Sequence, residues 1–168
     1  IRDQLDKESW RGSSDTETLL AAFQAWGVLK TLKQTIGMFA IALWDKQSKE
    51  LTLARDRFGE KPLFYGWQGG SFLFGSELKS LAVHPEWQGM IDRDALSLYT
   101  QFGYVPVPLS IWQGISKLPP GSFLTLPFDV AIGELPEPIF FWRATEFMRR
   151  GEDHGVDDAS AVEELEFR

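Results

Sequence analysis

Short apolar segments separated by polar turns are typical of β-strands, and they occupy the first half of the chain. The strands predicted from this pattern cover residues 38–44, 51–53, 63–67 and 72–74. The connections between them are short, and the last is the turn-forming pair Gly69-Gly70. Because a parallel return needs a crossover of a dozen residues or more, we expect one continuous antiparallel meander.

The first predicted strand contains no polar residue. Its seven consecutive apolar positions, 38–44, are too few to span a bilayer and are typical of a strand covered on both faces. Successive side chains are expected on opposite buried faces, with Ala40 and Ala42 on one and Phe39, Ile41 and Leu43 on the other. Such burial requires a layered structure with material on both sides of the sheet.

The clearest helix signal begins at Ser14. The sequence Ser-Asp-Thr-Glu predicts a capping box, in which the Ser14 hydroxyl accepts from the Glu17 N–H and the Glu17 carboxylate accepts from the Ser14 N–H. Apolar residues at helical spacing follow, and Gly27 is placed to end the helix. A short amphipathic turn around Leu29 and Leu32 leads into the first strand.

Two more helices are expected after the strands. Ser76 is a candidate cap for the first, and Asp92 is a candidate cap for the second, which Gly103 ends. The residues expected to face inward from the second helix are Leu96, Tyr99 and Phe102. Pro120-Gly121 fits the centre of a type II turn before a strand at 123–126.

The composition excludes several functions. The chain has 24 acidic against 17 basic residues and a net charge of -7, so nucleic acid and anionic membrane surfaces are not expected partners. It contains no cysteine, which excludes disulfides, cysteine-rich zinc sites and a cysteine nucleophile among these residues. We expect no metal site here and, in the absence of a signal-like segment, a cytoplasmic location.

Few residues carry an obvious chemical signal. His84 and His154 are far apart in sequence and are expected to be ordinary surface residues. The cluster Arg55-Asp56-Arg57 predicts ion pairing at a strand end. Asp15 has two interpretations, a first-turn acid that complements the helix dipole or a pocket carboxylate that binds a substrate ammonium. On this basis alone, the residues support only an antiparallel-sheet domain with helices.

Longer segments resemble a known family. The segments SSDTETLLAAFQAWG, GMFAIALWD, LTLARDRFGEKPLFYG, FLFGSELKSL and FGYVPVPLSIWQGISKLPPGSFL stand in the order and spacing of glutamine-hydrolysing asparagine synthetases. The resemblance covers residues 9–126 and continues more loosely beyond them. ARDRFGEKPLFYG is highly specific for that family, whereas DTE before a helix occurs more broadly in class II glutamine amidotransferases.

The resemblance implies an α+β fold, a four-layer αββα sandwich of the N-terminal-nucleophile hydrolase type, here truncated at both ends. In that family an N-terminal cysteine attacks the glutamine side-chain amide, its own α-amino group acts as base, and ammonia passes through a tunnel to a second domain. That domain activates aspartate with ATP and magnesium. Asp15 matches the aspartate that binds the α-amino group of glutamine.

By this resemblance, residues 1–126 form the amidotransferase domain without its N-terminal strands. Residues 127–168 form a linker and the start of a synthetase domain, with a helix expected at 157–168. The nucleophilic cysteine, the arginine that binds the glutamine carboxylate and the Asn-Gly pair of the oxyanion hole are expected upstream of Ile1. The Ser-Gly-Gly-x-Asp-Ser loop is expected after Arg168.

Three functions remain open on the sequence. The first is a part of an asparagine synthetase, with glutamine and aspartate as substrates and a homodimer as one candidate assembly. The second is a relative without glutaminase activity, as β-lactam-forming synthetases are. The third is a non-catalytic sandwich used for binding or dimerisation. An upstream Cys-Gly-Ile start in the encoding gene would favour the first.

Overall fold

The computed structural model describes residues 1–6, 9–146 and 148. Its helices are η1 (Arg2–Gln4), a short 3-10 turn, and the α-helices α1 (Asp15–Gln34), α2 (Leu78–Leu81) and α3 (Arg93–Phe102). The helix predicted at 157–168 and the residue His154 lie outside the described residues. No helix within the described ranges is both long enough and apolar enough to cross a membrane.

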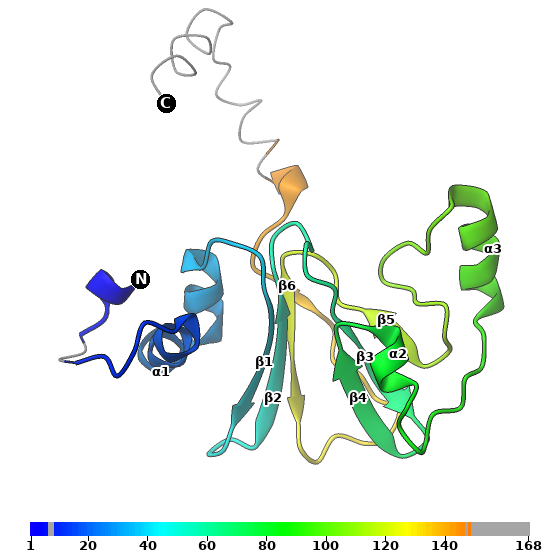
Figure 1. Ribbon diagram of the computed structural model, residues 1–168, viewed down its shortest axis with the longest axis horizontal. Helices are drawn as coiled ribbons and strands as arrows, with labels where there is room; N and C mark the ends of the chain where they lie inside the picture. The colour runs from blue at the N-terminus through cyan, green and yellow to red at the C-terminus, as the bar shows by residue number, and fades with distance from the viewer. Residues whose placement is uncertain (7–8, 147, 149–168) are drawn as a thin grey trace, which may run out of the picture.

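The strands that the structure describes form two antiparallel sheets (Figure 1). Sheet A contains, in spatial order, β1 (Ala40–Asp45), β2 (Glu50–Arg55), β6 (Ser122–Pro127) and β7 (Ile139–Phe140). Sheet B contains β4 (Ser71–Gly75), β3 (Phe64–Gln68) and β5 (Ile115–Lys117). The described residues therefore form a mixed α/β fold built on two antiparallel sheets.

The prediction of one continuous meander is wrong, because the chain changes sheet between β2 and β3. β1 pairs with β2 and β3 pairs with β4, as expected, and Gly69-Gly70 forms the turn of the second hairpin. However, β2 takes β6 as its other neighbour, and β3 takes β5. The loop 56–63 is long enough to pass between two facing sheets, so its length alone could not decide the pairing.

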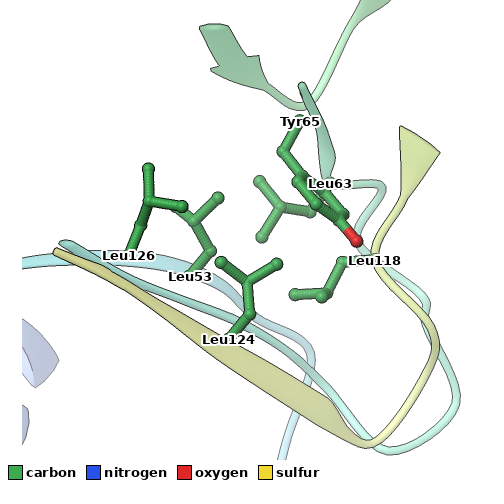
Figure 2. Packing of buried hydrophobic residues seen from close by; sticks show 6 residues of the cluster. All are labelled: Leu53, Leu63, Tyr65, Leu118, Leu124 and Leu126. Carbon is green, nitrogen blue, oxygen red and sulfur yellow. The ribbon is translucent and has the colours of Figure 1, made fainter. Parts of the chain in front are cut away.

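The two sheets enclose a core of leucines and one tyrosine (Figure 2). Its buried members are Leu53, Leu63, Tyr65, Leu118, Leu124 and Leu126. Leu53 of β2 and Leu124 of β6 are cross-strand partners and are fully buried. Burying a side chain of this size stabilises the fold by about 1.5–3 kcal/mol, so this cluster is a major source of its stability.

A second cluster lies where α1 packs against sheet A. Its buried members are Leu32, Ala54, Phe123 and Phe141, with Phe39 and Ile41 packed against them. Gly27 has φ 74° and ψ 175°, so α1 consists of two helical pieces that meet at a kink, visible as two coils at an angle in Figure 1. The helix stop predicted at Gly27 is therefore confirmed as a break. The amphipathic turn predicted after it is a second helical piece that carries Leu32 into the core.

Strand β1 shows the predicted alternation but not the predicted burial on both faces. Ala40 packs against the core between the sheets, whereas Phe39 and Ile41 pack against the cluster under α1. Ala42 and Trp44 are exposed, Trp44 to 45%. Among the described strands β1 lies at the edge of sheet A, with β2 as its neighbour on one side.

Helix α3 begins and ends where the sequence predicts. The Asp92 carboxylate accepts from the N–H groups of Asp94 and Ala95 at 2.9 and 3.0 Å, and Gly103 ends the helix with φ 76°. The inward orientation predicted for its apolar face is wrong, because Leu96, Tyr99 and Phe102 are 41%, 50% and 52% exposed. The helix lies beside sheet B (Figure 1). Ala95 is its buried residue, so most of its apolar face stays in contact with solvent.

The chain continues to contact sheet A after residue 127. β7 pairs with β6, and Phe141 is buried in the cluster under α1. The Phe141 N–H donates to the carbonyl of Gly121, which has φ 65°, as the centre of a type II turn requires. The division of the chain into residues 1–126 and 127–168 stays a prediction.

Replacing Ala40 by aspartate should destabilise the protein by several kcal/mol, since the new carboxylate would enter the core between the sheets without a partner. Lys46 is exposed in the β1–β2 turn, so Lys46→Asp is the matched control and should be nearly silent. Soluble yield and thermal melting of the two variants measure the difference. Equal tolerance at both positions would mean that Ala40 does not face the core.

Candidate functional site

A cleft of about 590 Å³ opens between the start of α1 and the segment that leads into β1. Helix α1 contributes Asp15 and Thr18 to its lining, and the entry to β1 contributes Phe39. Two loops contribute Lys61 and Ser76. The described lining residues therefore combine one acidic side chain, one basic side chain and several hydroxyl groups with an apolar wall.

Asp15 is the first residue of α1, and it lines this cleft while remaining exposed to solvent. A negative charge is favourable beside a helix N-terminus, so the dipole interpretation holds for this position. Within the described part of the chain, no cation lies at ion-pair distance from its carboxylate, which leaves the carboxylate open to a ligand. The structure brings Asp15 to the cleft, and its binding of a substrate ammonium stays a prediction.

Ser14 caps α1 as predicted, but both hydrogen bonds of the predicted capping box are wrong. Ser14 is the N-cap, but its hydroxyl accepts from the Thr16 N–H at 3.2 Å, where the sequence predicted the Glu17 N–H. The Glu17 carboxylate accepts from the N–H groups of Arg11 and Gly12, both at 3.1 Å. Glu17 therefore fixes the loop further upstream, and this loop leads directly into the turn that carries Asp15.

The prediction of ion pairing within Arg55-Asp56-Arg57 is wrong, because each side chain binds backbone groups. The Asp56 carboxylate accepts from the N–H groups of Phe39, Phe58, Glu60 and Lys61. The Arg55 guanidinium donates to the carbonyls of Gly59, Lys61 and Leu118, and the Arg57 guanidinium donates to those of Lys33 and Thr35. None of the three forms an ion pair with a described residue. The three side chains therefore hold backbone segments in place through hydrogen bonds and do not form ion pairs with described residues.

The Asp56 carboxyl is almost fully buried, with 1% of the residue exposed. Burial by itself would raise its pKa, but the N–H groups of Lys61, Glu60 and Phe39 outweigh that effect and hold the pKa below its ordinary value. Asp56 is therefore ionised at neutral pH, and hydrogen bonds from backbone N–H groups stabilise its charge.

Sequence reasoning missed Lys61 and Ser76 as cleft residues. Ser76 was expected to cap a helix, but the N-cap of α2 is Glu77, and Ser76 lines the cleft instead. Lys61 is a single lysine in a loop, which carries no periodic signal. Both residues lie within the segments that resemble asparagine synthetases, and this is the signal that could have found them.

The remaining candidate residue makes a local contact. His84 does not line the cleft, and its Nδ1 accepts from the Glu86 N–H at 3.3 Å. Within the described ranges, no three His, Cys, Asp or Glu side chains are grouped closely enough to hold a metal ion.

The cleft and its lining segments lie inside a region that matches a family model. The model describes a glutamine amidotransferase domain, and it matches residues 1–132. The chain belongs to this family. The matched region contains Asp15, the whole cleft lining and the Arg55-Asp56-Arg57 cluster, so the features described above belong to an amidotransferase domain.

Curated relatives of this amidotransferase domain are similar over most of its length. Glutamine-hydrolysing asparagine synthetase 3 of Bacillus subtilis is 40% identical over 118 residues, which cover 70% of this chain and 19% of the relative. Glutamine-hydrolysing asparagine synthetase 1 of the same organism is 36% identical over 131 residues, 77% of this chain and 20% of the relative. Amidase chry2 of Gibberella zeae is 32% identical over 122 residues, 71% of this chain and 17% of that protein. The matched region spans about a fifth of the length of these relatives.

Replacing Asp56 by asparagine should lower the free energy of unfolding at pH 7 by about 2 kcal/mol or more, since buried N–H groups would then face an amide NH₂. Because folding lowers the pKa of Asp56, its contribution is present above the ordinary aspartate pKa of about 3.9 and is lost as the pH falls through the lower folded value. The deficit of the variant should therefore shrink below about pH 4. Urea unfolding at pH 7 and pH 3 measures it.

Thr125→Val is the control for this experiment. The hydroxyls of Thr52 and Thr125 hydrogen-bond at 3.0 Å across sheet A, and neither group titrates in this range. Its deficit in unfolding free energy should be the same at both pH values. A deficit of Asp56→Asn that stays constant or grows at low pH would show that the ionised carboxylate does not stabilise the fold.

Proposed function

We propose that this amidotransferase domain binds glutamine in the cleft at the start of α1 and serves an asparagine synthetase. The observation that carries the proposal is the position of Asp15, a carboxylate in the cleft without a described cation partner. Such a carboxylate can form charge-assisted hydrogen bonds to the α-ammonium of an amino acid. The similarity to glutamine-hydrolysing asparagine synthetases supports glutamine as that amino acid.

In the proposed reaction, a cysteine thiolate attacks the side-chain amide carbon of glutamine, and the C–N bond breaks as the leaving nitrogen takes a proton from the base and departs as ammonia. Water then hydrolyses the glutamyl thioester to release glutamate and the free cysteine. The cysteine, the base, the carboxylate-binding arginine and the oxyanion-hole donors would come from residues upstream of Ile1. The residues of this chain bind and orient the substrate, with Asp15 holding the ammonium and the Phe39 side of the cleft forming an apolar wall. The two sheets and α1 are consistent with the four-layer αββα sandwich that this reaction uses.

The rest of the proposed enzyme lies in a synthetase domain beyond this chain. That domain would use ATP and magnesium to activate aspartate, and the ammonia released from glutamine would displace AMP to give asparagine. We propose a cytoplasmic enzyme that forms homodimers. The lengths of the relatives support this division, since the matched region accounts for about a fifth of each relative.

Asp15→Asn in the full-length enzyme should raise the KM for glutamine about ten- to a hundredfold, because a charge-assisted bond to the substrate ammonium is worth about 1.5–3 kcal/mol. Synthesis from free ammonia should stay nearly unchanged, since ammonia does not use the cleft. Steady-state assays with each nitrogen donor measure the two effects.

Asp94→Asn is the matched control for Asp15. Asp94 is also a first-turn acid, in α3, and it does not line the cleft. Its loss should leave both activities unchanged. If Asp15→Asn behaved like Asp94→Asn, or if both nitrogen donors lost activity together, the helix-dipole role of Asp15 would be sufficient and the binding role would be excluded.

The 168-residue chain by itself should have no glutaminase activity. It contains no cysteine, so the covalent step of the proposed reaction has no nucleophile. Glutamate release from glutamine should equal that of a buffer blank. Release above the blank that disappears in Asp15→Ala would contradict the proposed mechanism.

A further inference from the structure

The two carboxylate oxygens of Asp56 bind different parts of the chain. Oδ2 accepts from the N–H groups of Phe39 at 3.3 Å and Lys61 at 3.0 Å, and both residues line the cleft. Oδ1 accepts from the N–H groups of Phe58 at 3.1 Å and Glu60 at 3.0 Å, and neither residue lines the cleft. One oxygen therefore fixes two points of the cleft wall, while the other fixes the loop behind it.

Phe39 is held by Asp56 through both of its backbone polar groups. Its N–H donates to the Asp56 carboxylate, and its carbonyl accepts from the Asp56 N–H at 3.0 Å. The two residues are 17 positions apart, so these bonds fix the entry to β1 relative to the end of β2. The bond from the backbone N–H of Asp56 does not involve its side chain, so the contribution of the carboxylate to the position of Phe39 is the bond that it accepts from the Phe39 N–H.

Arg57 holds the other end of the same wall. Its guanidinium donates to the carbonyls of Lys33 and Thr35, where α1 ends, and Thr35 lines the cleft. Between Thr35 and Phe39, the residues Ile36 and Met38 also line the cleft and are 88% and 65% exposed. Because the middle of the segment 35–39 is so exposed, its position depends on the hydrogen bonds at its two ends, Thr35 and Phe39.

Arg55 and Asp56 share the stabilisation of the loop itself. Arg55 already binds the carbonyls of Gly59, Lys61 and Leu118, which secures the loop against the turn before β6. One bond of the Asp56 carboxylate, to Phe39, and one bond of Arg57, to Thr35, reach away from the loop to the segment 35–39. These two bonds fix the position of the segment 35–39, which lines the same cleft as Asp15.

We propose that Asp56 and Arg57 are positioning residues for the glutamine cleft and act through the backbone of the segment 35–39 and of Lys61. This inference rests on the proposed function. Neither residue is among those that line the cleft, so neither contacts the substrate directly. Their effect on glutamine use is expected through the placement of the wall relative to Asp15.

The test uses the full-length polypeptide that contains this chain, with Asp56→Asn, Arg57→Gln and the control Thr125→Val. Asp56→Asn should raise the KM for glutamine at least tenfold, and Arg57→Gln should raise it in the same direction. Both variants should keep ammonia-dependent synthesis within twofold of the wild type. Thr125→Val also removes a partly buried hydrogen bond, but one in sheet A away from the cleft, so it should change neither activity.

A double-mutant cycle separates positioning from a general structural effect. If Asp56 acts by placing the wall beside Asp15, the combined loss in Asp15→Asn/Asp56→Asn should be smaller than the product of the single losses. Multiplicative losses, or an equal loss of ammonia-dependent synthesis, would overturn the positioning role. If Asp56→Asn does not fold, the same cycle with Arg57→Gln decides the question.

The wild-type enzyme distinguishes failure of this inference from failure of the proposed function. Glutamate release by the wild type, together with glutamine KM values for Asp56→Asn and Arg57→Gln equal to that of Thr125→Val, would overturn only the positioning role. Absence of glutamate release by the full-length wild type would overturn the proposed function and this inference with it.

Discussion

The crossing between the two sheets depends on one buried carboxylate. Asp56 follows directly after β2, at the point where the chain leaves sheet A, and it accepts four backbone N–H groups. Its own carbonyl accepts from the N–H groups of Gly59 and Gly121 at 3.1 and 2.8 Å. These bonds gather the entry to β1, the crossing loop and the turn before β6 around a single residue. Backbone N–H groups stabilise the charge of this carboxylate, which forms no ion pair with a described residue.

The same contacts link the fold to the cleft. The loop that Asp56 organises is packed tightly, since a Cβ on Gly59 would meet the Pro120 side chain at 2.9 Å, and Gly59 has φ 69°. Arg55 ties this loop to the turn before β6, whereas Asp56 and Arg57 tie it to the wall of the cleft. This arrangement gives a physical reason why the stretch ARDRFGEKPLFYG is so specific. The side chains of Arg55, Asp56 and Arg57 each have particular backbone partners, which a different side chain would leave without a hydrogen bond.

The sequence by itself determined the features that depend on neighbouring residues. Ser14 and Asp92 cap helices as expected, and Gly27 and Gly103 interrupt or end them, because a cap bonds to N–H groups within a few positions and glycine adopts a positive φ freely. The hairpin at Gly69-Gly70 and the approximate positions of β1, β2, β3, β4 and β6 also follow from local patterns, whereas the short strands β5 and β7 were not predicted. The resemblance also identified the family, since it relied on the order of whole segments.

Only the tertiary structure decided which strands pair beyond the two hairpins, and where the charged side chains point. Thr52 meets Thr125 across 73 positions, and Asp56 reaches Phe39 across 17, distances at which a local pattern carries no information. An apolar run likewise cannot show whether its strand lies at the centre or at the edge of a sheet, so the exposure of Trp44 was not foreseen. Every residue other than proline has the same backbone N–H and carbonyl groups, so the sequence does not show which of them will bind a given side chain. The role of Asp56 therefore became visible only when the loop, the cleft wall and the turn before β6 were placed together.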